Sequence, residues 1–227
     1  MPDFIFPPLV TFVPIEGGGD FPVRRVFCVG RNYAEHAREM GHDPDAELPF
    51  FFSKPADALV TGGADAPYPP ATKDLHHEVE LVVAIGKEAR DIDPAAAPDV
   101  IFGYAAGIDL TRRDLQAEAK KLSRPWDMAK GFDHSAPISS IVPATRMSHP
   151  VRGRIELKVN GDTRQSGDLR DMIWDVPNLV AHLSGFVALM PGDLIFTGTP
   201  SGVGPVVRDD VLEGVIEGVA TVRTVIT

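Results

Sequence analysis

The stretch from His76 to Ile85, HHEVELVVAI, places two glutamates at the start of a strongly apolar run. The part from Val79 onward is rich in β-branched residues, and this composition predicts a buried strand. Because strand side chains alternate between two faces, Glu78 and Glu80 are expected to share one face, roughly 7 Å apart. Two unpaired like charges beside a hydrophobic core are costly, so a positive partner is expected between them. A hard divalent cation, which prefers oxygen ligands, is the first candidate.

Asp109 is the third candidate ligand. It ends a second apolar run, IFGYAAGID from 101 to 109, which also predicts a strand, and an acid at such an end can face a cleft. Three carboxylates would hold a cation such as magnesium, manganese or calcium and leave positions open for water or substrate. Spacing alone leaves a second interpretation open, in which one glutamate lies at a sheet edge and Asp109 belongs to a turn. His76 shares the parity of the glutamates, so it is a weaker candidate ligand, or a residue that supports the ligands.

The composition is that of an ordinary globular chain and argues against several classes of protein. The 227 residues are 44% hydrophobic and 24% charged, which is enough to bury a sizeable core. A net charge of −10 argues against a nucleic-acid partner, because binding phosphates needs a basic surface. No window reaches the ~18 apolar residues of a membrane span, and the N-terminus shows no secretory signal. A single cysteine, Cys28, fits a reducing compartment, so we expect a cytoplasmic protein without a membrane partner.

Short elements separated by turns run along the chain, which contains 21 glycines and 21 prolines. Residues 1–22 predict an extension of two short strands around Gly17-Gly18-Gly19, and residues 23–227 predict one larger domain. The capping-box pattern from Thr111 to Asp114 predicts a helix running to about Lys121. Regular alternation of strand and helix is absent, so the predicted fold class is α+β, strand-rich with interspersed short helices.

His36 and Glu39 lie three residues apart in a short predicted helix, 33–40, and therefore share a face. A carboxylate beside an imidazole orients it and raises its basicity, as a general base acting on water requires. A solvated helix surface is the other interpretation of this pair. Lys54 and Lys130 have apolar neighbours, in FFFSKP and WDMAKGF, which distinguishes them from ordinary surface lysines. The loop 197–204, TGTPSGVG, is typical of a backbone anion site but lacks a nucleotide-binding pattern.

Seven motifs, taken together and in their order, resemble the fumarylacetoacetate hydrolase family. They cover nearly all of the chain beyond residue 22: CVGRNYAEHAREMG (28–41), PFFFSKPADA (49–58), HHEVELVVAIGK (76–87), GYAAGIDLTRRDLQ (103–116), RPWDMAKGFDHSAPI (124–138), LKVNGDTRQSG (157–167) and DLIFTGTPSGVGP (193–205). The N-terminal FIFPPLV and the segment TRRDLQ most resemble the bacterial fumarylpyruvate hydrolases and the acylpyruvases. The resemblance implies a mixed β-sandwich or roll for the catalytic domain, and assembly as a homodimer.

The same resemblance implies roles for particular residues. Glu78, Glu80 and Asp109 would hold one Mg²⁺ or Mn²⁺ per subunit, and His36 with Glu39 would activate water on a lid that orders when substrate binds. Lys130 is similar to the family's active-site lysine, and with Gln116 it is expected to stabilise an oxyanion. The residues expected to line the substrate pocket are Arg31, Tyr33, Lys54, Arg113 and Thr199, and of these Arg31 or Lys54 is expected to bind the carboxylate at the far end of the substrate.

The expected reaction is metal-dependent hydrolysis of a carbon–carbon bond in a 1,3-diketo acid. Fumarylpyruvate, cleaved to fumarate and pyruvate in gentisate-type aromatic degradation, is the first candidate substrate. The alternatives are a general acylpyruvase, oxaloacetate decarboxylation at the same metal, and isomerase or decarboxylase chemistry on hydroxymuconate-type diacids. A non-catalytic binding protein on the same fold is disfavoured by the complete set of acids and the His36–Glu39 pair. In each catalytic interpretation the partner is a small keto acid.

Overall fold

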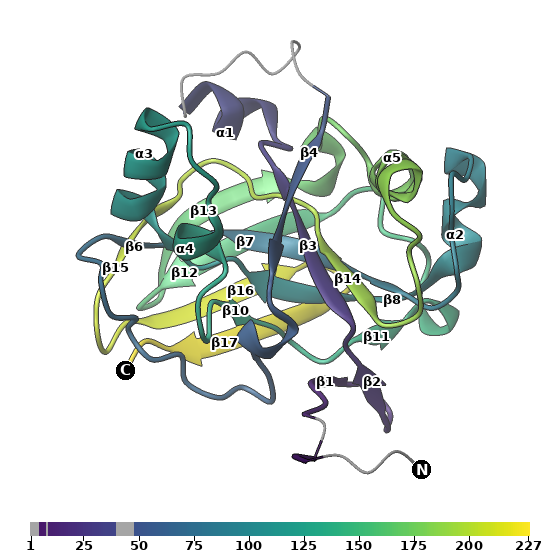
Figure 1. The fold of residues 1–227 in the computed structure, drawn as a ribbon, viewed down its shortest axis with the longest axis horizontal. Helices are drawn as coiled ribbons and strands as arrows, with labels where there is room; N and C mark the ends of the chain where they lie inside the picture. Colours follow the sequence, from purple (N-terminus) through teal and green to yellow (C-terminus); the bar gives the residue numbers. More distant parts are fainter. Residues whose placement is uncertain (1–4, 8, 40–47) are drawn as a thin grey trace.

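A mixed six-stranded sheet forms the centre of the molecule (Figure 1), and the computed structural model describes residues 5–7, 9–39 and 48–227. Its strands run in the order β11-β8-β7-β14-β3-β4, with β14 parallel to β3 and the other neighbours antiparallel. The strands are β3 (Arg25–Gly30), β4 (Phe50–Lys54), β7 (Val79–Ile85), β8 (Ile101–Ile108), β11 (Val142–Pro143) and β14 (Asp193–Phe196). Every residue of β7 is buried, so the predicted buried strand at 79–85 is confirmed.

A four-stranded antiparallel sheet packs against β7 and β8 and completes a sandwich. Its strands are β12 (Arg154–Val159), β13 (Asp162–Asp168), β16 (Val211–Ile216) and β17 (Ala220–Val225). The side chains of β7 alternate between the two faces of the sheet, as those of any strand do. Leu81 and Val83 join the core that contains Leu157 of the second sheet, whereas Val82 joins a second apolar cluster with Cys28. Burying each such side chain contributes about 1.5–3 kcal/mol, so both faces of β7 fix its position.

Three smaller sheets surround this sandwich. They pair β6 (Leu75–His77) with β9 (Thr111–Arg112) and β15 (Gly204–Val206), β5 (Leu59–Val60) with β10 (Ala136–Pro137), and β1 (Phe12–Pro14) with β2 (Asp20–Pro22). The β1–β2 pair is the predicted N-terminal hairpin, and its turn at Gly17–Gly19 uses positive φ angles. Val13 and Phe21 of this hairpin are buried in the same cluster as Val26 of β3. A domain boundary at residue 22 stays a prediction.

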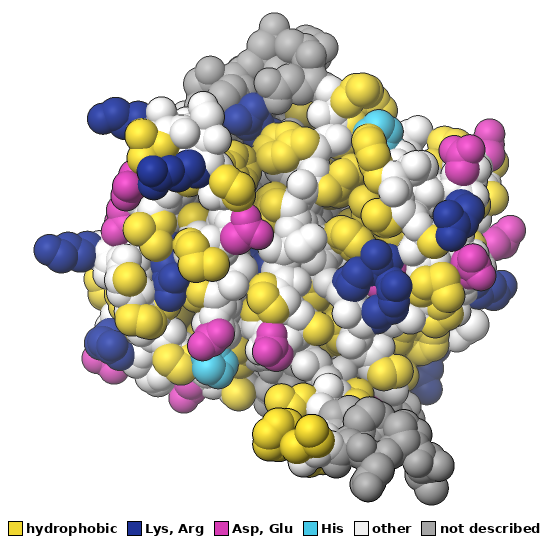
Figure 2. All heavy atoms as spheres, in the orientation of Figure 1, with side chains coloured by type: hydrophobic (Ala, Val, Ile, Leu, Met, Phe, Trp, Pro, Cys, Tyr) yellow, Lys and Arg dark blue, Asp and Glu magenta, His cyan; other side chains and the backbone are white. Residues whose placement is uncertain are grey.

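The helices are short and lie around the edges of the sandwich (Figure 1). They are α1 (Ala34–Glu39), α2 (Ala97–Val100), α3 (Arg113–Lys121), α4 (Asp127–Lys130) and α5 (Val176–Phe186), with 3₁₀ turns at Ala56–Ala58, Pro94–Ala96, Ala144–Arg146 and Leu169–Asp171. Within the described ranges, no helix is long and apolar enough to cross a membrane. Acidic and basic side chains are interspersed with apolar ones over the face shown in Figure 2.

The predicted capping box at Thr111 is wrong. Thr111 pairs with His76 as part of β9, and the N-cap of α3 is Arg112, which makes no side-chain capping bond. The Asp114 carboxylate instead accepts hydrogen bonds from the Thr72 hydroxyl at 2.6 Å and the Lys73 amide at 3.0 Å. Strand pairing with β6 therefore prevails over the local capping pattern, and the helix begins two residues later, at Arg113.

Candidate metal centre and active site

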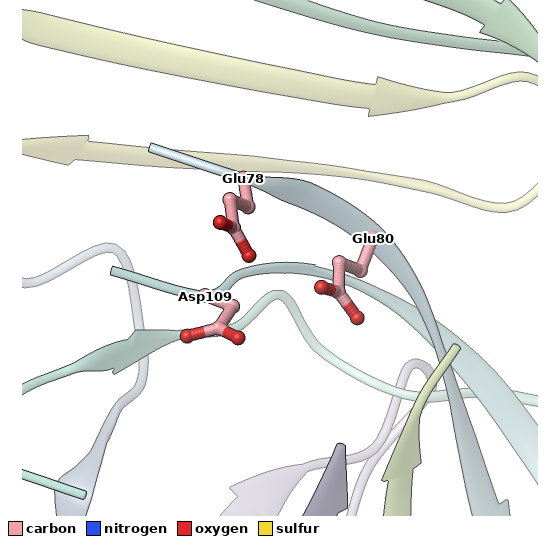
Figure 3. A group of neighbouring side chains, drawn as sticks. All are labelled: Glu78, Glu80 and Asp109. Carbon is pink, nitrogen blue, oxygen red and sulfur yellow. The ribbon is translucent and has the colours of Figure 1, made fainter. Parts of the chain in front are cut away.

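Glu78, Glu80 and Asp109 converge on one buried point (Figure 3), with one oxygen of each within 4.8 Å of the others. Glu80 lies in β7, but Glu78 occupies the junction between β6 and β7 and Asp109 directly follows β8. The pairing of β7 with β8 brings the three together, because the Asp109 amide donates to the Glu78 carbonyl at 2.8 Å. The structure thus places all three predicted ligands in a single group.

Three cations surround these carboxylates. Lys130 Nζ donates to Glu78 and to Asp109, at 2.7 Å in both cases, and Arg113 lies 2.5 Å from the other oxygen of Glu78. Lys54 Nζ lies 2.8 Å from Asp109 Oδ1 as an ion pair without hydrogen-bond geometry. Its hydrogen bonds go instead to the carbonyls of Leu110 and Lys130. Lys54 is therefore buried beneath the acids rather than exposed to a ligand above them.

The loop after β14 holds Glu80 in place. The Gly198 amide donates to Glu80 Oε2 at 2.7 Å, and the Thr199 hydroxyl donates to the Val79 carbonyl at 2.7 Å. Gly198 has a φ of 94°, and a Cβ there would lie 2.7 Å from the Cβ of Asn32, so only glycine fits. In the loop predicted to bind an anion with its backbone amides, the Gly198 amide is directed at the protein's own Glu80.

The two glutamates have pKa values displaced in opposite directions. Burial opposes ionisation of Glu78, but Lys130 and Arg113 outweigh it and hold the pKa of Glu78 well below its usual range. Burial, reinforced by Asp109 and Glu78, raises the pKa of Glu80 well above its usual value. Of the two glutamates, Glu80 is therefore the one whose negative charge is less compensated by neighbouring cations.

This environment fits a divalent cation. The donor set consists of three carboxylates, the ligand type that Mg²⁺ and Mn²⁺ prefer, and Asp109 Oδ1 is a buried oxygen that accepts no hydrogen bond. A cation bound there would favour the ionised form of Glu80, which burial and the neighbouring acids disfavour. Within the described ranges no histidine belongs to the group, since His76 pairs with Asp74 at 2.9 Å. His76 is therefore not brought to the site as a ligand.

His36 and Glu39 form the predicted pair on α1. His36 Nδ1 lies 3.3 Å from Glu39 Oε2, which also accepts a hydrogen bond from the Gly202 amide at 3.3 Å. The imidazole is buried and lines the same cavity as Glu78 and Glu80. Burial lowers the pKa of His36 below 6.5, against the opposing effects of Glu78 and Glu39. The ring is therefore neutral at pH 7 and able to accept a proton.

Replacing Glu39 with Gln is expected to move the acid limb of the kcat/KM profile to lower pH. The carboxylate raises the pKa of His36, so an uncharged amide lowers that pKa further and the imidazole stays neutral in more acidic solution. The plateau rate falls as well, because the base is weaker. The profile of Glu39→Gln should be compared with that of Glu35→Gln, an exposed position on the same helix. An acid limb that stays in place, or moves to higher pH, contradicts the pairing.

One cavity brings together most of the residues predicted for the site. Its lining includes Arg31, His36, Glu78, Glu80, Arg113, Gln116, Lys130 and Thr199. Gln116 Oε1 accepts from Arg113 at 2.7 Å, which directs the amide nitrogen of Gln116 elsewhere. Two predicted pocket residues lie apart from this cavity: Lys54 below Asp109, and Tyr33 in a separate depression beside Ser166 and Pro200. The structure gives neither of them contact with the space above the acids.

Residues that the sequence analysis missed also line the cavity or support it. Phe52, Lys120 and Trp126 belong to the lining, as do Val29 and Gly30. A signal for Lys120 was present, because it follows Gln116 by four residues and so shares its helix face. Gln165, on β13, is fully buried behind the site and had no local signal, since its partners are distant in sequence.

Gln165 joins three segments that position the acids, and its loss should destabilise the protein. Its Oε1 lies 3.0 Å from both His77 Nδ1 and the Val79 amide, and its Nε2 donates to Thr199 Oγ1 at 2.7 Å and the Pro200 carbonyl at 2.9 Å. Gln165→Leu leaves these buried groups unpaired and is expected to lower the free energy of unfolding by about 2–5 kcal/mol. Denaturant unfolding beside Arg164→Leu, at the exposed neighbouring position, measures this; a loss under ~0.5 kcal/mol contradicts it.

A buried carboxylate group for a divalent cation, next to a histidine–glutamate pair within a mixed β-sandwich, defines a metal-dependent enzyme. The chain belongs to the fumarylacetoacetate hydrolase family, because residues 25–227 match the model of the "Fumarylacetoacetate (FAA) hydrolase C-terminal" domain. The strand-rich mixed-sheet fold expected from the motifs is confirmed.

The chain is similar to members of the family with different named activities. It is 47% identical to fumarylpyruvate hydrolase from Pseudomonas aeruginosa, solved with Mn²⁺ and pyruvate, and the superposition covers 99% of both chains with a TM-score of 0.97. It is 42% identical over 200 residues to the mitochondrial oxaloacetate tautomerase FAHD1 of Bos taurus, covering 88% of this chain and 90% of the relative. It is also 43% identical over 199 residues to the mitochondrial oxaloacetate decarboxylase of Dictyostelium discoideum, covering 87% and 91% respectively.

Proposed function

We propose that this protein hydrolyses an acylpyruvate, with fumarylpyruvate as the preferred substrate and fumarate and pyruvate as the products. The observation that carries the proposal is the neutral His36, oriented by Glu39, in the same cavity as the buried acids. Hydrolysis needs a base that activates water next to an electrophilic centre, and this pair supplies it. The likeness to a fumarylpyruvate hydrolase over 99% of the chain supports the same substrate.

Glu78, Glu80 and Asp109 are the residues that would hold Mg²⁺ or Mn²⁺. The bound cation would supply a Lewis acid for the oxygens of the pyruvyl group and favour negative charge on them. Lys130 already bridges two of the ligands, and Asp109 and Glu78 raise its pKa against the effect of burial, so it stays protonated.

His36 takes a proton from water, whose oxygen then adds to the carbonyl carbon of the acyl group. Gln116, with its Oε1 occupied by Arg113, has its amide hydrogens available as donors to the oxyanion that develops there. Lys130, which also lines the cavity, is a second donor and carries a positive charge. The carbon–carbon bond then breaks, so the acyl group leaves as a carboxylate and the pyruvyl group as an enolate, which gains a proton to give pyruvate.

A direct assay tests this proposal. Fumarylpyruvate, acetylpyruvate and oxaloacetate should be followed by absorbance side by side, each with Mg²⁺, Mn²⁺ or a chelator. We expect metal-dependent loss of the acylpyruvates, with fumarylpyruvate consumed at the highest kcat/KM. Turnover of oxaloacetate without cleavage of either acylpyruvate would overturn the proposal.

Oxaloacetate chemistry is the second candidate, because two of the relatives described above are named for a tautomerase and a decarboxylase of oxaloacetate. The carboxylate centre serves either reaction, since both place negative charge on a keto oxygen. Decarboxylation needs no attacking water, so it makes no use of His36 as a base that activates water. The role of His36 therefore distinguishes hydrolysis from decarboxylation of oxaloacetate.

A further inference from the structure

The lining of the cavity combines two kinds of charged side chain. The acids Glu78 and Glu80 form what we call its acidic end, and Arg31 and Lys120, which lie over the rings of Phe50 and Trp126, form what we call its basic end. Lys120 projects from α3 on the face that also carries Gln116, four residues earlier, and so points toward the same space. The proposed chemistry uses the acidic end and leaves the basic end without a role.

Lys120 is half-buried and has no acidic partner within ion-pair distance among residues 5–7, 9–39 and 48–227. Its Nζ lies 5.2 Å from the centre of the Trp126 ring. Burial, and then the charges of Arg113 and Arg31, lower the pKa of Lys120. The electrostatic repulsion between a partly buried ammonium group and neighbouring cations is reduced when an anionic ligand binds between them.

Aromatic rings connect the two ends. Trp126 meets Phe50 edge-on, with centroids 5.5 Å apart, and Phe52 at 5.9 Å. Lys130 Nζ, at the acidic end, lies 5.0 Å from the centre of the Phe52 ring, and the Arg31 guanidinium lies 5.2 Å from that of Phe50. A wall of rings therefore runs from the acids to the basic end. Such a wall favours a planar, unsaturated segment over a bulky one.

We propose that Lys120, together with Arg31, binds a second carboxylate at the far end of the substrate, while Phe52 and Trp126 contact the planar segment in between. The substrate class is then an unsaturated acylpyruvate with a terminal carboxylate, rather than one with a neutral acyl group. This inference rests on the proposed function, since it takes the pyruvyl end to lie at the acids. Lys120 takes the place of Lys54, which the motifs assigned to the substrate pocket but which is buried under Asp109.

Lys120→Met tests the inference against Lys121→Met, which removes the same charge from the exposed next position. We expect Lys120→Met to raise KM for fumarylpyruvate by about 10- to 100-fold, the effect of losing one charged hydrogen bond. KM for acetylpyruvate, which lacks the second carboxylate, should change by less than about 3-fold, and Lys121→Met should resemble the wild type with both substrates. An equal loss with both substrates, or the same loss in Lys121→Met, overturns the inference.

A binding measurement separates this inference from the proposed function. Calorimetry on the Mn²⁺-loaded protein should compare 2-oxoheptanedioate with 2-oxoheptanoate, which differ only in the terminal carboxylate and lack the acyl carbonyl. We expect the wild type to prefer the dicarboxylate by about tenfold or more, and Lys120→Met to lose that preference. If this holds but neither acylpyruvate is hydrolysed, the inference stands and the proposed function fails. If fumarylpyruvate is hydrolysed but Lys120→Met keeps the preference, the inference fails and the function stands.

Discussion

Glu80→Gln is expected to abolish metal-dependent turnover without unfolding the protein. The substitution removes one of the three candidate ligands. Losing a residue that only supports a ligand lowers metal affinity by up to about 100-fold, so we expect the loss of a ligand itself to lower Mn²⁺ affinity by at least that factor. Glutamine keeps an oxygen that can accept the hydrogen bond from the Gly198 amide, so the loop after β14 retains its anchor. Activity and metal binding should therefore be lost together.

The same substitution should leave the metal-free protein as stable as the wild type, or more stable, at pH 7. The pKa of Glu80 is raised by burial, Asp109 and Glu78, so the residue lowers the stability of the folded state above the ordinary carboxyl pKa, where the unfolded state ionises more readily than the folded one. Glutamine carries no such charge, and its advantage should disappear as the pH falls below about 4.3, where the unfolded state also binds the proton.

Thermal unfolding with and without Mn²⁺, combined with calorimetric titration of Mn²⁺, measures both effects. Wild-type protein should gain thermal stability on adding Mn²⁺, by mass action, and Glu80→Gln should gain almost none. Glu118→Gln, the same chemical change at an exposed position on α3, serves as the control and should behave as the wild type. Wild-type Mn²⁺ affinity in Glu80→Gln would show that the carboxylate group is not the metal centre.

His36→Ala is expected to lower kcat for fumarylpyruvate by about 10²- to 10⁴-fold, the usual contribution of a positioned general base. The side chain lies near Glu78 but is not part of the carboxylate group, so Mn²⁺ affinity should stay within about 3-fold of the wild type. Any decarboxylation of oxaloacetate should fall far less, because that reaction requires no water to be activated. The variant thus separates metal binding from catalysis.

Parallel kinetics and Mn²⁺ titration of His36→Ala and Arg38→Ala provide the measurement. Arg38 is exposed on the same short helix, so its loss controls for damage to α1. Full activity in His36→Ala would contradict the assignment of His36 as the general base. Equal losses with fumarylpyruvate and oxaloacetate would place His36 in substrate binding rather than in the activation of water.

The strand at 79–85 and the identity of the three acids could be predicted from sequence because the signals are local. A continuous run of apolar, largely β-branched residues specifies the strand, which is buried along its whole length, and acids at the ends of apolar runs have few roles other than binding charge. The capping box at Thr111 failed for the opposite reason. Its residues have a partner far away in sequence, His76 of β6, and strand pairing with that partner prevailed over the local pattern.

The positions of the cations could not be predicted, because they depend on depth rather than on residue type. Lys54 and Lys130 both have apolar neighbours in sequence, yet Lys54 lies beneath Asp109 while Lys130 bridges two acids at the cavity surface. Lys120 resembles a solvated lysine in sequence, and only the neighbouring Trp126 and the basic residues around it distinguish it. The role of Gln165 could not be predicted for the same reason, because its hydrogen-bond partners belong to other segments of the chain.

Residue type and spacing were enough to name the candidate donor set and the candidate base with its partner, and the order of the motifs along the chain favoured these interpretations over a sheet edge and a solvated helix. Tertiary structure alone decided how the charges are distributed around the acids. The pairing of β7 with β8 places Asp109 beside Glu78, and the loop at Gly198 turns an amide onto Glu80. Electrostatic energies depend on distances of a few ångströms and on burial, and both are set by contacts between segments far apart in the chain.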